Sequence, residues 1–240
     1  MAVRARYRVE AAMTTPARWR QRWRVGLAVA ALLAGCAGGP PPPDWQGNAK
    51  AAVDGAVQAS LSGDSRLEAR EFERARSELA RTGRLDWMAR AELMRCAAHT
   101  ASLAFEPCQG FERLRQDAAP AELVYADHLA GRPLSRDDIA RLPPAQRDAA
   151  AAIAGNAGSP VSLQGIDDPL SRLIAAALLF RAGKASPQMM ALATDTASAQ
   201  GWRRPLLAWL QVQALRAERA GAPDEAQQLR RRIDLVQGGR

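Results

Sequence analysis

The stretch DPLSRLIAAALLFRAG, residues 168–183, decides the fold class of this chain. Asp168 is a favourable N-cap, and Pro169 stands at the first helical position, where its missing N–H group costs no hydrogen bond. A run rich in Leu, Ile and Ala follows, and Gly183 stands where a left-handed C-terminal cap is needed. The stretch therefore predicts a short helix that begins at Pro169 and ends just before Gly183.

The same start and stop signals recur toward the end of the chain. Prolines at helix-start positions follow in Ser186-Pro187, Arg204-Pro205 and Ala222-Pro223, and Gly201 and Gly221 stand near the ends of the intervening helices. This spacing predicts short antiparallel helices between residues 168 and 237.

Upstream segments also have the period of helices. Between residues 85 and 103, apolar and small residues recur every three or four positions, which predicts one buried stripe. Its members are Leu85, Met88, Ala89, Leu93, Cys96, Ala97 and Thr100, while Arg90, Glu92 and Arg95 lie off it. Glycines and prolines delimit helices near 46–62, 65–82, 85–103, 108–117 and 120–130, and a shorter helix is expected at 144–154 within a less regular stretch from 131 to 165. Strand signals are nearly absent, so we expect an all-α protein with an N-terminal helical region, 46–165, and C-terminal helix pairs, 166–240.

The two C-terminal helix pairs look like copies of each other. The prolines that start them are 36 positions apart, and the glycines that end their first helices are 38 apart, which is a period of helix-pair repeats. Through Trp209, Gly221 and Ala226 the second pair weakly resembles a tetratricopeptide repeat, although the Gly and Tyr usual inside the first helix are missing. The resemblance implies antiparallel hairpins stacked as a short α-solenoid. An irregular helical array, with chance similarity between two Ala- and Leu-rich hairpins, is the alternative.

The N-terminus carries an export signature. Several arginines between residues 18 and 24 precede an apolar stretch, Val25–Leu33, and Leu33-Ala34-Gly35-Cys36 closes it. This order of features resembles the lipobox signal of bacterial lipoproteins. A transmembrane helix fits less well, because the nine apolar residues of Val25–Leu33 fall short of the roughly 20 that span a bilayer. An ordinary signal peptide that happens to end near a cysteine is the other alternative, and Met13 is a second candidate for the start of translation.

The lipobox resemblance implies that residues 1–35 are removed as a signal peptide and that Cys36 is acylated. Residues 36–45 then form a tether, since Pro40–Pro43 favour an extended chain. Ala37 follows the cysteine, and by resemblance to enteric sorting the lack of Asp there implies the periplasmic face of the outer membrane. The predicted location is therefore the bacterial cell envelope, with the membrane as a partner through the N-terminal lipid.

Removing the signal changes the charge balance. The whole chain has 33 basic and 25 acidic residues, a formal charge of +8. Residues 1–35 contain seven arginines and one acidic residue, so the remainder has 26 basic and 24 acidic residues, a formal charge of +2. The basic footprint of a nucleic-acid-binding protein is therefore lost, and we predict no nucleic-acid partner. The run Arg230–Arg232 is expected to be a solvated helix face.

Cys96 and Cys108 are predicted to form a disulfide. An even cysteine pair in an exported chain favours a bridge, and Glu106-Pro107 breaks the helix so that the chain can turn back. Two unlinked core cysteines are the alternative. No CxxC spacing or histidine cluster accompanies the pair, so we predict no metal and no cofactor.

Catalytic motifs are sparse. Gly63-Asp64-Ser65 superficially resembles the nucleophile block of GDSL-type esterases, but the fourth residue is Arg66 and no strand precedes it. A turn in which Asp64 or Ser65 caps the next helix explains the same residues. No recognisable motif surrounds His99 or His128, which are expected to be structural, and the Glu-Ser pair of lytic transglycosylases is absent.

These features predict a lipid-anchored helical scaffold that binds an envelope protein or peptide, and not an enzyme. Trp202, Arg203 and Arg204, at a junction between helices, are the expected partner-binding patch, with core packing as the alternative for Trp202. The alternative function is a periplasmic cell-wall hydrolase or another envelope enzyme without a recognisable motif. A groove lined by apolar and Arg residues favours binding, whereas a closed cleft with a buried acid of raised pKa favours catalysis.

Overall fold

The computed structural model describes residues 43–155 and 161–238. The chain separates into two compact units, Met1–Pro43 and Asp44–Arg240, and the described helices all belong to the second. The predicted signal segment 1–35, the lipidation site Cys36 and residues 37–42 of the tether lie outside the described residues.

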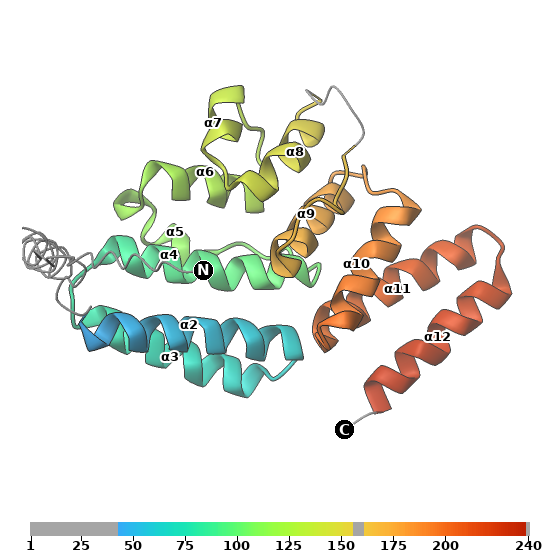
Figure 1. Ribbon diagram of the computed structural model, residues 1–240, viewed down its shortest axis with the longest axis horizontal. Coiled ribbons are helices and arrows are strands. Elements are labelled where there is room, and N and C mark those ends of the chain that lie inside the picture. The colour runs from blue at the N-terminus through green and yellow to red at the C-terminus, as the bar shows by residue number, and fades with distance from the viewer. Residues whose placement is uncertain (1–42, 156–160, 239–240) are drawn as a thin grey trace, which may run out of the picture. The chain divides into compact units, whose positions relative to one another are not determined.

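An all-α fold is confirmed for the described part of the chain, which contains helices and no strand (Figure 1). None of these helices combines the length and the hydropathy that crossing a membrane requires. In chain order they are α2 (Asp44–Ser62), α3 (Ser65–Ala80), α4 (Leu85–Ala101), α5 (Gln109–Glu112), the 3-10 turn η1 (Arg115–Asp117), α6 (Pro120–Leu129), α7 (Arg136–Arg141), α8 (Pro144–Ile153), α9 (Pro169–Arg181), α10 (Pro187–Ala199), α11 (Arg203–Arg219) and α12 (Pro223–Gly238).

Helix ends in the C-terminal half follow the predicted signals. Asp168 caps α9, because its carboxylate accepts a hydrogen bond of 2.7 Å from the Ser171 N–H. Gly183, Gly201 and Gly221 follow α9, α10 and α11 with φ of 70°, 66° and 68°, the left-handed conformation of a glycine cap. The predicted short helices therefore form, and each of the helices α9 to α12 packs on the next.

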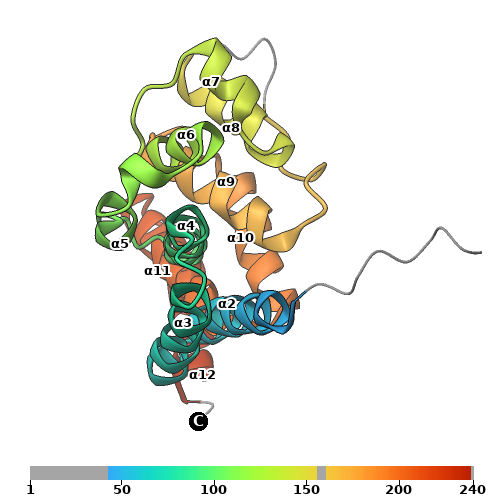
Figure 2. The same ribbon diagram turned by 90° about the vertical axis from the view of Figure 1, so that its left-hand side faces the viewer.

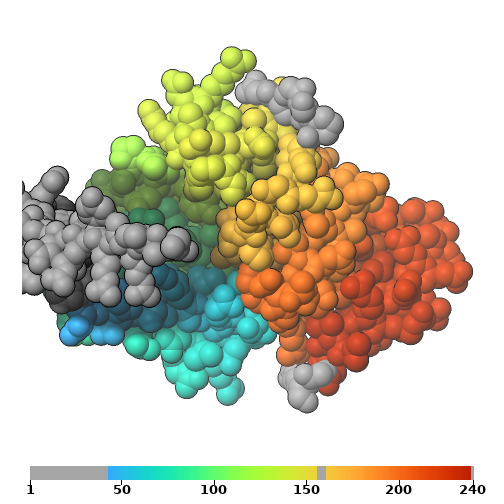
Figure 3. All heavy atoms as spheres, viewed as in Figure 1, coloured from blue at the N-terminus to red at the C-terminus, as the bar shows by residue number. Residues whose placement is uncertain are grey.

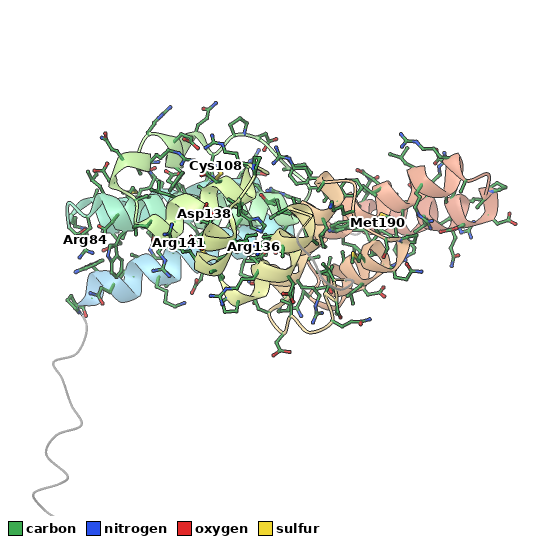
Figure 4. The ribbon with its side chains drawn as sticks, turned by 90° about the horizontal axis from the view of Figure 1, so that it is seen from above. Arg84, Cys108, Arg136, Asp138, Arg141 and Met190 are labelled. Carbon is green, nitrogen blue, oxygen red and sulfur yellow. A yellow bond between two sulfur atoms is a disulfide. The ribbon has the colours of Figure 1, made fainter. Side chains whose placement is uncertain are left out.

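Three segments differ from the expected helices. The helix expected at 108–117 is divided into α5 and η1, and α11 begins at Arg203, two residues before its proline. The sequence signals do not predict α7, because its 6 residues are too few to establish a helical period. A capping box starts α7, with Ser135 Oγ accepting a hydrogen bond of 3.1 Å from the Asp138 N–H. Asp138 and Arg141, both labelled on this helix in Figure 4, form an ion pair of 3.2 Å.

Helix α4 corrects the prediction of a single buried stripe. Ala89, Leu93 and Ala97 are buried as expected, but Leu85 is 50% exposed. Glu92, which was expected off the stripe, is only 4% exposed. The reason is that α4 packs against α2 and α3 on one side and against α6 and α9 on the other (Figure 2). A helix between two layers buries more than one stripe.

The largest apolar core is centred on α9, the helix formed by the stretch DPLSRLIAAALLFRAG. Residues 173–179, Leu-Ile-Ala-Ala-Ala-Leu-Leu, are all buried, so this part of α9 is covered on every side. The same core takes residues from α2, α4, α6, α8, α10 and α11. The regions 46–165 and 166–240 therefore share one core.

Candidate functional site

A buried carboxylate organises the most polar part of the described helices. Glu68, in the first turn of α3, is 4% exposed. Its Oε1 lies 2.6 Å from His99 Nε2 and accepts a hydrogen bond of 3.3 Å from Arg95 Nε, both on α4. Its Oε2 accepts a hydrogen bond of 3.1 Å from Arg204 on α11. The consecutive helices α3 and α4 and the distant helix α11 thus meet at one side chain.

Arg204 extends this cluster to helix α2. Its Nη1 also donates to Ser60 Oγ at 2.9 Å, and its Nη2 donates to Ser65 Oγ at 2.8 Å. The space-filling view shows the same junction from outside, with the turn between α2 and α3 lying against the segment near residue 200 (Figure 3). Helices α2 and α3 form the first helical hairpin of the described chain. Arg204 is therefore a structural link between this first helical hairpin and α11.

Electrostatics keep Glu68 ionised. Burial is the largest influence on its pKa and raises it, but the hydrogen bonds and charges of His99 and Arg204 together lower the pKa below its usual value. An ionised carboxylate only accepts hydrogen bonds, so the Nε2–H of His99 is the donor in this pair. The floor of the site is thus a negative charge surrounded by cationic and polar donors.

Three hollows above this cluster share lining residues and form one polar groove. A hollow of about 360 Å³ beside the two cysteines shares Arg95, His99 and Glu106 with a hollow of about 460 Å³ over Glu68. The latter shares Ser65 and Arg204 with a hollow of about 720 Å³, which is also lined by Arg66, Arg203 and Leu207. We call the three together the polar groove.

The three residues of the predicted partner-binding patch lie in different surroundings: Trp202 is buried, whereas Arg203 and Arg204 line the polar groove. Trp202 is the N-cap residue of α11 and is 7% exposed, with Nε1 donating a hydrogen bond of 3.2 Å to Gln58 on α2. The alternative of core packing therefore holds for Trp202, because the segment before α11 closes over the end of the first hairpin. Arg203 and Arg204 do line the polar groove.

The two cysteines lie at one end of this groove at a distance that fits a disulfide. The Cα atoms of Cys96 and Cys108 are 5.9 Å apart, within the usual range for a bridged pair. Figure 4 labels Cys108 above α4, in the segment that turns back over this helix. Among the residues that the structure describes, no group of three or more His, Cys, Asp or Glu side chains is arranged to hold a metal ion.

The esterase-like triplet is a helix cap. Asp64 is the N-cap of α3, with its carboxylate accepting a hydrogen bond of 2.9 Å from the Leu67 N–H. Ser65 Oγ is held by Arg204. Nevertheless, Ser65, Glu68 and His99 line the same hollow. Sequence reasoning missed this grouping, because Glu68 and His99 are 31 positions apart and no motif joins them.

Glu92 is a second buried acid at the groove. Burial raises its pKa, and the charges of Arg76, Arg95 and Arg113 oppose that rise only in part. Its Oε1 accepts a hydrogen bond of 2.6 Å from Arg76 on α3. A side chain at Gly110 would overlap the Glu92 carboxylate, so the glycine allows α5 to approach α4.

His128 lies away from the groove in a buried position next to Gln146. Burial lowers its pKa to about 4, and the neighbouring Gln146 side chain opposes this shift in part. Its Nε2 has no hydrogen-bond partner. A neutral histidine enclosed among helices has no access to a substrate.

No family model matches this chain, and no curated protein or solved structure matches it.

Proposed function

We propose that this protein is a lipid-anchored scaffold of the bacterial envelope, located on the periplasmic face of the outer membrane, whose polar groove binds a partner protein or peptide. The lipobox-like segment ending at Cys36 supports the anchor. The stacked, weakly tetratricopeptide-like hairpins support a role in binding, since helix-pair arrays present extended surfaces to peptides. No chemistry is required of the groove in this role.

The polar groove is the observation that carries the proposal. Its floor is fixed by the hydrogen bonds of Glu68 and Arg204, so its shape exists before a partner arrives. Its wider end offers Arg66, Arg203 and Leu207, two cations beside an apolar side chain, while Asp64 in the same lining is engaged in capping α3. Arginine is enriched among the residues that dominate protein interfaces. The partner that fits this end is a peptide segment with a carboxylate next to an apolar residue.

Charge reversal at the groove tests this role. Arg66→Glu combined with Arg203→Glu should abolish complementation of a deletion strain while the protein still accumulates. Arg231→Glu, which reverses an exposed charge on α12, is the matched control and should complement normally. Full complementation by the double variant contradicts a binding role for the groove.

Site-specific crosslinking adds a physical readout of the same surface. A photoreactive residue at position 207 should capture a partner in intact envelopes, and the double charge reversal should remove that product. Position 215 lies on the same helix, is exposed and lines none of the three hollows, so it serves as the control. Equal capture at both positions would show that contact with the groove is not specific.

A hydrolase is the second candidate function, because Ser65, Glu68 and His99 line one hollow and because Glu92 has a raised pKa. Against it, Ser65 is bound to Arg204 and Glu92 to Arg76. Ser65→Ala, His99→Gln and Glu92→Gln distinguish the two functions. A folded single variant that still gives the crosslink from position 207 but no longer complements supports the enzyme, whereas variants that keep or lose both together support the scaffold.

A further inference from the structure

Exposed aromatic and apolar side chains gather where α2 and α4 begin. Leu85 and Trp87 are 50% and 37% exposed, and they are two of the few large apolar residues exposed in the described chain. The ring of Trp87 meets that of the half-buried Trp45 edge to face, with centroids 5.3 Å apart. We call these three residues the tryptophan patch. Beside it, an apolar hollow of about 430 Å³ opens between α2 and α4.

The surroundings of the patch are charged, and most of the charges are paired. The Arg84 guanidinium lies 5.4 Å from the centre of the Trp87 ring and pairs with Asp86 at 2.7 Å. Lys50, at the rim of the apolar hollow, pairs with Asp54. Arg90 also lines this hollow, is exposed and makes no ion pair with a described residue, so one cation beside the patch is uncompensated. The chemistry favours a surface that accepts indole and aliphatic groups and tolerates a basic side chain beside them.

The place of the patch in the chain points to one such surface. The patch includes Trp45, the second residue of α2, and α2 is the helix that follows the predicted tether (Figure 4 labels Arg84 close to this end). Eight positions separate Cys36 from Asp44. At about 3.3–3.6 Å per residue they span at most about 30 Å. If Cys36 is acylated, the start of α2 cannot lie farther than this from the lipid headgroups.

We propose that the tryptophan patch rests on the lipid bilayer that holds the acylated N-terminus. This inference rests on the proposed anchor. Tryptophan rings concentrate at the boundary between headgroups and acyl chains, where one part of the indole is apolar and its N–H group stays hydrated. Basic side chains beside the rings keep their charges in the headgroup layer. The tether keeps the patch close to the lipid surface, which raises its effective concentration there. Even a small apolar patch then binds the surface for much of the time. This contact orients the helical unit relative to the membrane.

The tryptophan content allows a direct test. Trp45, Trp87, Trp202 and Trp209 are the tryptophans that remain after residue 35. Trp202 and Trp209 are buried in the core. Acylated mature protein is reconstituted in phosphatidylcholine vesicles with or without bromine on the acyl chains, and its fluorescence is compared. We expect bromine to reduce the emission of the wild-type protein and to leave that of a Trp45→Phe/Trp87→Phe variant unchanged.

The anchor and the patch are distinguished in the same experiment. Flotation of the vesicles and mass measurement report whether the protein is acylated. The unacylated mature chain is also attached to brominated vesicles through an N-terminal hexahistidine tag and a nickel-chelating lipid, which tests the patch without Cys36 chemistry. If the nickel-tethered chain is quenched by brominated lipid but the native protein is not acylated, the result supports the patch and contradicts the proposed anchor. Unquenched emission from protein that floats overturns the patch, as does equal quenching of the double variant.

A second copy of the chain is the competing occupant of the patch. It would protect both rings from brominated lipid and would make the unacylated mature chain sediment as a dimer that Trp87→Glu dissociates. That result also overturns the proposal.

Discussion

Arg204 on α11 donates a hydrogen bond of 3.1 Å to Glu68 on α3, which precedes it by 136 positions. The pair closes the first helical hairpin onto the C-terminal helices. Glu68 is buried and ionised, so the loss of a cationic partner leaves part of its charge uncompensated.

Arg204→Ala is therefore expected to lower the free energy of unfolding by about 2–3 kcal/mol, somewhat less than for a fully buried pair because Arg95 and His99 remain. Chemical denaturation followed by circular dichroism measures the change. Arg203→Ala is the matched control, since among the described residues the side chain of this neighbouring arginine makes a single hydrogen bond, of 3.3 Å to the carbonyl of Gln237. Equal denaturation midpoints for the two variants would contradict a structural role for the Arg204–Glu68 pair.

His128 should make the protein sensitive to mild acid. Its folded pKa is about 4, below the ordinary 6.5, so the unfolded state binds more protons at intermediate pH. The contribution of this group to stability is therefore complete above about pH 6.5 and falls as the pH drops toward 4. Between pH 7 and pH 5 the loss should be on the order of 2 kcal/mol.

A His128→Leu variant tests this expectation, because it removes the titrating group and keeps an apolar side chain in the core. Its free energy of unfolding should change less between pH 7 and pH 5 than that of the wild type. Glu68 does not confuse the comparison, since its lowered pKa makes it lose stability only at lower pH and in both proteins. The same pH slope in both proteins would show that His128 is not the sensitive group.

Cys96 and Cys108 should be linked in protein recovered from the periplasm. Mass mapping of unreduced peptides is expected to show them joined. Replacing both by Ser should cost about 3 kcal/mol, the typical value for a loop of this size. Free thiols at both positions in exported protein would refute the bridge.

Cys36→Ser should abolish lipid attachment, because the lipobox-like segment offers its thiol as the acyl acceptor. Metabolic labelling with a palmitate analogue should mark the wild-type protein and not the variant. Cys96→Ser, which leaves the lipobox-like segment intact, is the control and should be labelled normally. Label retained by Cys36→Ser would exclude this residue as the acylation site.

Local signals in the sequence predicted helix ends well. An Asp followed by Pro begins α9, and a glycine with positive φ follows it, because both effects act within one turn of the chain. The same local logic identified Asp64 as a cap and not as part of an esterase motif. It did not find α7, whose short span gives no period.

These local signals could not predict which residues that are distant in sequence pack together. Glu68, His99 and Arg204 carry no shared motif, and only the arrangement of α3, α4 and α11 brings them together. The same limit applies to Trp202, which was named in the partner-binding patch with core packing as the alternative, because only its packing against α2 decides for the core. It also explains Glu92, because periodicity along one helix does not reveal that neighbours cover two of its faces.

Helix α9 also determines when this protein can fold. Its buried residues 173–179 touch the core from both the earlier and the later helices. A chain made from its N-terminus presents α2 to α8 first, and the apolar surface that these helices bury against α9 stays uncovered until residue 181 has been added. A truncation before α9 is therefore expected to leave this surface exposed and to yield a protease-sensitive chain instead of a shorter folded one.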